Sequence, residues 1–267
     1  MNSSTLHSPK IISFINQKGG CGKSSLCFHA AGAFASRGER VLLIDADPQG
    51  SLSRGFFGSM LIDHLSASET LAQIFEPETE YVRLDTICRE TPIANVSMIC
   101  ANHLLARWNL PEPARSLVNQ FDIDTLCQRA TQFDRILIDC PPNLHLCTWN
   151  ALLASDFALV PVPPEDFGTQ GLPAVHQAIE QARIINSRIQ LLGHVITRQD
   201  RRLLIHAAFE EMLRKRYGDL IFATVIPEAS AFKVALACRQ PVTSSEPRSR
   251  AAQLTHLMCH EMVNRME

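Results

Sequence analysis

Short runs of apolar residues alternate along the whole chain with segments that have helical spacing. Most of these runs are apolar at consecutive positions, which is typical of central strands in a parallel sheet covered by helices on both faces. The runs that predict strands are residues 11–16, 40–47, 96–101, 135–140, 157–162, 189–197 and 221–227.

The segments between these runs predict helices. Residues 25–36 place apolar side chains on one stripe, and Gly38 follows as a stop signal. Residues 203–216 repeat apolar residues at three- and four-residue steps, with basic residues in the last turn. Residues 54–92 are the least regular, and we expect helices and loops there at one edge. The alternation predicts an α/β fold: a doubly wound, mostly parallel sheet with helices on both faces.

The composition is that of a globular protein, with 46% hydrophobic and 19% charged residues. The net charge of −2 means that nucleic-acid binding would need a local basic patch. The nine cysteines include no CxxC pair, so their usage fits a reducing cytoplasm rather than a zinc ribbon. No run approaches the roughly 20 apolar residues of a membrane span. We expect residues 1–9 to be a short N-terminal extension and residues 10–267 a single domain.

The segment 16–25, NQKGGCGKSS, follows a predicted strand and opens a predicted helix, which is the context of a phosphate-binding loop. Its glycines let backbone N–H groups point at anionic oxygens, and the helix start adds a positive dipole end. Lys23 is expected to contact the β- and γ-phosphates, and the Ser24 hydroxyl to bind Mg²⁺. No chemistry is assigned to the Cys21 side chain. The positions expected around the nucleotide are Gly19, Gly20, Cys21, Gly22, Lys23, Ser24 and Ser25.

Three carboxylates lie at the ends of two other predicted strands. Asp45 and Asp47 end the strand 40–47, and Asp139 ends the strand 135–140. The carboxyl ends of parallel strands share one edge of the sheet, where ligands bind. The strand before Asp139 matches a Walker B strand, whose aspartate holds the magnesium shell. The alternative for the first pair is a surface turn, because Asp-Pro is good turn chemistry.

The strict pattern G-x-x-x-x-G-K-[ST] fails because Gln17 occupies the first glycine position. What is present, K-G-G-x-G-K-S, resembles the deviant Walker A motif of the ParA/MinD group of ATPases, and the preceding NQ is most similar to ParA. DxDPQG at 45–50 resembles the second motif of the same family. The resemblance implies an ATPase that uses Mg²⁺. It also implies that Lys18 reaches the nucleotide of a partner subunit, that Asp47 positions the attacking water, and that Asp45 belongs to the magnesium shell.

The resemblance continues through most of the chain. The stretch 224–242 resembles the family's late VIP segment, which implies that Pro227 and Glu228 cradle adenine. It further implies an ATP-dependent homodimer, associated with the nucleoid, that binds DNA nonspecifically and partitions a plasmid or chromosome with a ParB-like partner. Arg202 matches a DNA-contact arginine of the family. A second family arginine is absent here, so we expect Lys233 and Arg239 to substitute for it.

Several alternatives stay open. TRQD at 197–200 loosely imitates the guanine motif [NT]-K-x-D, whereas the family pattern makes Asp200 a helix N-cap. The basic residues of 198–216 can also be a solvated helix end. A MinD-like protein would dock on a membrane through its C-terminal helix, but residues 251–267 carry few basic residues. We therefore expect that helix to pack on the core, with no membrane partner. Positioning of a protein cargo or membrane-associated machinery is the alternative function.

Overall fold

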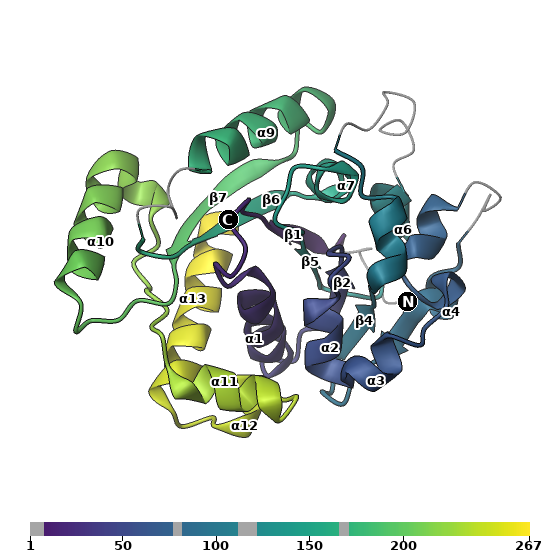
Figure 1. Cartoon of the computed structure of the whole chain (residues 1–267), viewed down its shortest axis with the longest axis horizontal. Coiled ribbons are helices and arrows are strands. Elements are labelled where there is room, and N and C mark those ends of the chain that lie inside the picture. Colours follow the sequence, from purple (N-terminus) through teal and green to yellow (C-terminus); the bar gives the residue numbers. More distant parts are fainter. Residues whose placement is uncertain (1–7, 77–81, 112–121, 166–170) are drawn as a thin grey trace, which may run out of the picture.

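A computed structural model describes residues 8–76, 82–111, 122–165 and 171–267 (Figure 1). Its centre is a seven-stranded sheet with the order β3-β4-β2-β5-β1-β6-β7. All neighbouring strands are parallel except β3 and β4. The strands are β1 (Lys10–Phe14), β2 (Val41–Asp45), β3 (Cys88–Glu90), β4 (Val96–Ile99), β5 (Arg135–Asp139), β6 (Phe157–Val162) and β7 (Gln190–Ile196). The predicted doubly wound α/β fold is confirmed.

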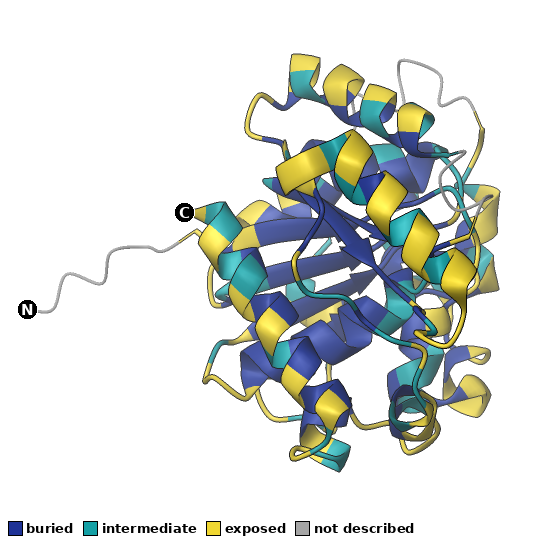
Figure 2. Ribbon diagram, turned by 90° about the vertical axis from the view of Figure 1, so that its left-hand side faces the viewer, coloured by how far each residue is buried: buried dark blue, intermediate teal, exposed yellow. Residues whose placement is uncertain are grey.

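Helices cover both faces of the sheet, so the strands are almost entirely buried (Figure 2). On one face α1 (Lys23–Ala35) lies beside α13 (Arg250–Met266), and α6, α7 and α9 cover the other (Figure 1). Besides α1 and α13, the described helices are α2 (Ser51–Phe57), α3 (Ser59–Ile62), α4 (Leu84–Ile87), α6 (Asp122–Arg129), α7 (Leu146–Ala154), α9 (Leu172–Ile185), α10 (Leu204–Tyr217), α11 (Ser230–Ala237) and α12 (Val242–Ser245). The described 3-10 turns are η1 (Ala67–Glu69), η2 (Leu71–Phe75), η3 (His103–Arg107) and η4 (Gly218–Leu220).

Six of the seven predicted strands are confirmed, and the seventh, 221–227, is wrong. That segment makes only isolated bridges to the 194–199 region. Side chains of α13 form hydrogen bonds with several of its backbone groups instead. Glu261 accepts from the N–H groups of Ala223 and Thr224, and Arg265 donates to the Ile221 carbonyl. The segment therefore runs along the sheet edge without completing a ladder.

The structure tests the prediction at the C-terminal end of the chain. Residues 1–7 of the predicted extension lie outside the described residues. The C-terminal helix α13 packs on the core as expected, with Met258 and Met262 fully buried. Leu257 of the same helix is 51% exposed. Within the described residues, no helix has the length and apolar character needed to cross a membrane.

Gly32 lies in the middle of α1, where the chain entering α12 crosses it. A Cβ atom at Gly32 would lie 2.3 Å from Pro241 Cβ and 2.8 Å from Thr243 Oγ1. We therefore expect Gly32→Ala to lower the free energy of unfolding by about 1–3 kcal/mol, although alanine favours helix. The matched control is Gly55→Ala in α2, whose Cβ would meet nothing closer than 3.5 Å. Urea denaturation should show a loss only for Gly32→Ala; equal changes in the two variants would contradict this packing.

The His29 ring is buried between α1 and α12, where its Nδ1 accepts a hydrogen bond of 3.1 Å from the Val242 N–H. Burial lowers the pKa of His29 to about 3. The unfolded chain therefore takes up this proton first, so the free energy of unfolding decreases as pH falls below about 6.5, by up to ~1.4 kcal/mol per pH unit. His29→Asn keeps an acceptor near Val242 and removes the titration. We expect a shallower pH slope of stability between about pH 6.5 and 4.

Urea denaturation of both proteins at several pH values measures these slopes. Burial also lowers the pKa of His194 to about 3, so part of the slope persists in the variant. A slope equal to that of the natural chain would show that His29 does not titrate on unfolding.

Candidate functional site

The loop between β1 and α1 sits at the carboxyl edge of the sheet, with β5 and β6 on either side of β1. Gly20 and Gly22 adopt φ values of 71° and 97°, a region that favours glycine. Asn16 fixes the loop entrance: its side chain donates to the Pro161 carbonyl at 2.7 Å and accepts from the Lys18 N–H at 2.9 Å. The backbone can therefore curl tightly before α1 begins at Lys23.

Lys23 lies inside this loop rather than in solvent. It is 6% exposed, and its Nζ donates to the carbonyls of Asn16 at 3.0 Å and Lys18 at 3.1 Å. Its ammonium is thus held at the centre of the curled backbone, beside the helix start, where positive charge and backbone N–H groups favour an anion.

A pocket of about 420 Å³ opens beside the loop. One part of its wall holds all the predicted loop positions from 19 to 25, and another part, which we call the base wall, holds Pro227, Glu228 and Phe232. Asp47 and Arg198 also line it. The structure therefore brings the predicted loop and the predicted base-side residues into one cavity of a size typical of small-molecule sites.

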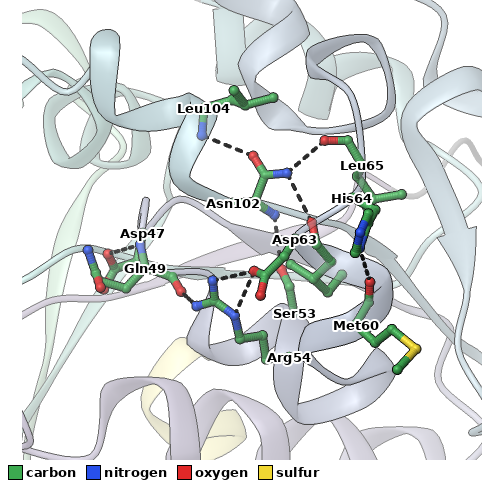
Figure 3. A network of polar contacts seen from close by, with 12 residues as sticks. Asp47, Gln49, Ser53, Arg54, Met60, Asp63, His64, Leu65, Asn102 and Leu104 are labelled. Carbon is green, nitrogen blue, oxygen red and sulfur yellow. Dashed lines mark hydrogen bonds and ion pairs between the residues drawn. The ribbon is translucent and has the colours of Figure 1, made fainter.

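Asp47 faces this pocket from the loop after β2. It is 8% exposed, and its Oδ1 accepts from the Gln49 N–H at 2.9 Å (Figure 3). Burial raises the pKa of this carboxyl, while the nearby Lys23 ammonium lowers it. A carboxylate held in this way can accept a proton or hydrogen bond from a molecule in the pocket.

Asp45, at the end of β2, is fully buried and does not line the pocket. Its Oδ2 accepts from the N–H and the hydroxyl of Ser53, at 2.8 and 2.7 Å, and its Oδ1 accepts from the Asp47 N–H at 3.1 Å. Burial raises the pKa of Asp45 to about 7. Its carboxyl group therefore ties the strand end to the start of α2.

Asp139 has a different environment at the end of the neighbouring strand β5. It is fully buried, and neither carboxylate oxygen accepts a hydrogen bond of normal geometry from the described residues. Burial and the nearby Asp45 raise the pKa of Asp139, and Ser24 and Lys23 offset this in part. A buried carboxyl without a partner is costly unless a cation compensates it.

Magnesium fits this donor set. Mg²⁺ prefers oxygen ligands and usually takes one or two protein carboxylates, completing its shell with phosphate and water. Asp139 offers two oxygens that accept no hydrogen bond of normal geometry from the described residues, and the adjacent Ser24 hydroxyl offers a third oxygen. Along the described parts of the chain, no group of three or more His, Cys, Asp or Glu could hold a metal unaided.

Lys18 points elsewhere than Lys23 and does not line the pocket. Its Nζ forms an ion pair of 2.6 Å with Glu165, which follows β6, and the lysine and glutamate side chains are 25% and 49% exposed. The two loop lysines are therefore separated in space: one is inside the loop and one is at the surface.

Polar contacts that the sequence did not reveal fix the region around Asp47 (Figure 3). Arg54 of α2 pairs with Asp63 at 2.7 Å and donates to the Gln49 carbonyl. Asn102, after β4, donates from its side-chain nitrogen to the carbonyls at 62 and 65. These residues have no motif, and only the fold brings them together.

The three predicted DNA contacts are exposed but differ in their surroundings. Arg202 is 88% exposed at its side chain and pairs with Asp200 at 2.6 Å. Lys233 pairs with Glu228 at 2.6 Å, and Arg239 lies against the 57–58 turn. The predicted N-cap at 200 is wrong, because α10 is capped by Leu203 and the Asp200 carboxylate accepts from the Arg202 N–H instead.

Comparison with known proteins shows the family to which the chain belongs. A family model described as an AAA domain matches residues 9–191. The chromosome partitioning protein ParA of Caulobacter vibrioides is 30% identical over 266 residues, which cover 96% of this chain and 94% of that protein. The sporulation initiation inhibitor protein Soj of Bacillus subtilis is 30% identical over 251 residues, which cover 92% and 94%. The chain belongs to the ParA/Soj family of ATPases.

This membership confirms the resemblance seen in K-G-G-x-G-K-S and DxDPQG. A solved structure of similar fold is a putative plasmid partition protein from Borrelia burgdorferi bound to AMPPNP, with a TM-score of 0.75 and 22% identity. The match covers 96% of this chain and 98% of that one, so the ParA/Soj fold extends over nearly the whole molecule.

Proposed function

We propose that this ParA/Soj family member is a nucleotide switch that binds Mg·ATP, dimerises in that state and hydrolyses ATP slowly. The observation that carries the proposal is the pocket that the curled loop, with Lys23, shares with the 227–232 segment, beside the buried carboxyl of Asp139. We also infer that residues 10–267 form one ATPase domain, because the core clusters connect β1 to α13.

Each wall has its own task in this mechanism. The loop N–H groups and Lys23 bind the phosphates, while Pro227 and Glu228 hold the base. Ser24 and Asp139 would hold a magnesium ion, which would neutralise charge on the phosphates. Asp45 would support that site indirectly, because both of its oxygens are already bonded to the protein. Asp47 orients the attacking water, since phosphoryl transfer depends mainly on positioning and charge stabilisation.

Dimerisation is proposed to depend on Lys18. Its ammonium is at the surface, outside its own pocket, and can therefore serve a nucleotide bound by a second subunit. Only the form with a γ-phosphate completes that contact, so ATP binding supplies the differential free energy that favours the dimer.

The proposed task is partition of DNA with a ParB-like partner, in association with the nucleoid. The relatives named for chromosome partitioning support it, as does the exposure of Arg202. Lys233 and Arg239 give weaker support, because one is paired with an acid and the other contacts the 57–58 turn. Binding through such groups would be nonspecific in sequence and would weaken steeply with salt.

Sedimentation of the Asp47→Ala variant with and without Mg·ATP tests the switch. We expect a monomer without nucleotide and a dimer with ATP, because the variant binds but does not turn over. A monomer under both conditions would overturn the dimer proposal. Retention of the ATP form on random duplex DNA tests the task. A dimer without DNA retention would favour the alternative of a cargo-positioning ATPase.

A further inference from the structure

Arg198 joins the two walls of the nucleotide pocket. Its Nη1 donates to the Gly20 carbonyl in the phosphate loop at 2.9 Å, and its Nε donates to the Glu228 carboxylate at 3.0 Å. We call these two contacts the Arg198 bridge. Glu228 is also paired with Lys233, which lines the same pocket. The bridge therefore links the loop that contacts phosphates to the segment that contacts the base.

The neighbouring Thr197 supports the same loop. Its hydroxyl donates to the Cys21 carbonyl at 2.7 Å, and it is buried against Gly22. In a trans peptide the carbonyl and the following N–H point in opposite directions. Holding the carbonyls of Gly20 and Cys21 toward residues 197–198 therefore directs the next two N–H groups the other way. Orientation of those N–H groups is what an anion-binding loop requires.

The backbone around Arg198 shows that this arrangement is imposed by the fold. Arg198 has a φ of 56°, which non-glycine residues adopt only when their surroundings hold them there. Two backbone hydrogen bonds tie Gln199 to the other wall, with its N–H donating to Ile226 and its carbonyl accepting from Glu228. Arg198 therefore follows the end of β7, and its neighbours Thr197 and Gln199 are hydrogen-bonded to the phosphate loop and to the base wall.

We propose that Arg198 is a positioning residue that holds the phosphate loop and the base wall together and thereby slows nucleotide release. This inference rests on the proposed ATP binding. It gives TRQD a role that does not involve guanine: the arginine acts on the loop carbonyl and on Glu228. Because the guanidinium is planar with several donors, it can bond both partners at once, which an ammonium on a flexible stem does less well.

The first test is the dissociation rate of a fluorescent ATP analogue in Arg198→Gly, since glycine accepts the positive φ. We expect the rate to rise about tenfold, as for loss of a hydrogen bond to a charged group. Arg198→Lys should recover part of the loss. Arg201→Ala, an exposed neighbour outside the pocket, should release the analogue at the rate of the natural chain.

Glu228→Ala removes the other end of the bridge and carries the test if Arg198→Gly does not fold. Its dissociation rate for the analogue should also rise. In the double variant the rate should rise by less than the product of the two single-variant increases. If the natural chain binds ATP and Arg198→Gly releases the analogue at the same rate as the natural chain, this inference is overturned and the proposed function is not. A natural chain that binds no ATP would instead overturn the proposed function. Multiplicative effects in the double variant would show that the two residues act separately and would also overturn the bridge.

Discussion

Replacing Lys23 with alanine is expected to weaken ATP binding by at least about 100-fold, which corresponds to roughly 2.7 kcal/mol. The Lys23 ammonium is buried at the centre of the loop and donates to carbonyls of its own loop backbone and to the Cys21 sulfur. In the proposed mechanism it exchanges those carbonyls for phosphate oxygens. Charge-assisted bonds of this kind are the strong ones, and they gain further strength where water is excluded.

Titration of a fluorescent ATP analogue in the presence of Mg²⁺ measures this effect. Lys10→Ala is the matched control, because it removes the same charge at the exposed, opposite end of β1. Thermal unfolding of both variants separates loss of binding from loss of folding. If Lys23→Ala bound ATP as well as Lys10→Ala, the phosphate role of Lys23 would be wrong.

Lys18→Ala should behave differently from Lys23→Ala, although the two residues are only five positions apart. We expect it to leave the ATP affinity of the monomer nearly unchanged and to remove the ATP-dependent dimer. Sedimentation of the double variant Lys18→Ala, Asp47→Ala in the presence of Mg·ATP measures the dimer, because Asp47→Ala blocks turnover. A stable ATP dimer of the double variant would exclude an essential role for Lys18 across the interface.

Asp139→Asn is expected to abolish the effect of Mg²⁺ on ATP affinity and to lower turnover by about 100-fold, a barrier increase of roughly 2.7 kcal/mol. Neither carboxylate oxygen of Asp139 accepts a hydrogen bond of normal geometry from the described residues, and an amide offers Mg²⁺ a much weaker ligand. Without Mg²⁺ the variant should bind ATP about as well as the natural chain. Titrating ATP affinity against Mg²⁺ concentration shows both effects in one experiment.

Asp45→Asn is the control for this prediction. Asp45 accepts three hydrogen bonds, two of them from Ser53 of α2, so its loss should lower the free energy of unfolding by about 1–3 kcal/mol. The dependence of ATP affinity on Mg²⁺ should largely persist. The reverse pattern, with the dependence lost in Asp45→Asn and kept in Asp139→Asn, would move the direct magnesium ligand from Asp139 to Asp45.

The sequence was sufficient to predict the sheet and the loop, because both depend on local signals. Consecutive apolar residues identify buried strands, and glycines with a lysine at a strand–helix junction identify an anion site. The strand predicted at 221–227 was wrong for a nonlocal reason: Glu261 and Arg265, some forty residues later, take its backbone groups. The short strand β3 was not predicted, since its three residues are only partly buried or exposed.

The same division applies to the site. Its motif residues were predicted because each lies next to a strand end or in the loop. Their partners were not, because they come from distant segments without a motif: Ser53 on Asp45, Glu165 on Lys18, and Arg198 on the Gly20 carbonyl. Whether a carboxylate is free for a metal or already bonded to the protein depends on such contacts. That is why Asp45 and Asp139 look equivalent in the sequence and differ in the fold.

The ion pair between Lys18 and Glu165 has a consequence for how the proposed dimer forms. Lys18 already has an anionic partner in its own chain, so reaching a second subunit's phosphate means exchanging one ion pair for another. The dimer then gains only the difference between two attractions, and the number of paired charges stays nearly constant. Such an exchange depends less on ionic strength than the capture of a free cation would. It also leaves the Glu165 carboxylate available to a new cation each time the dimer assembles.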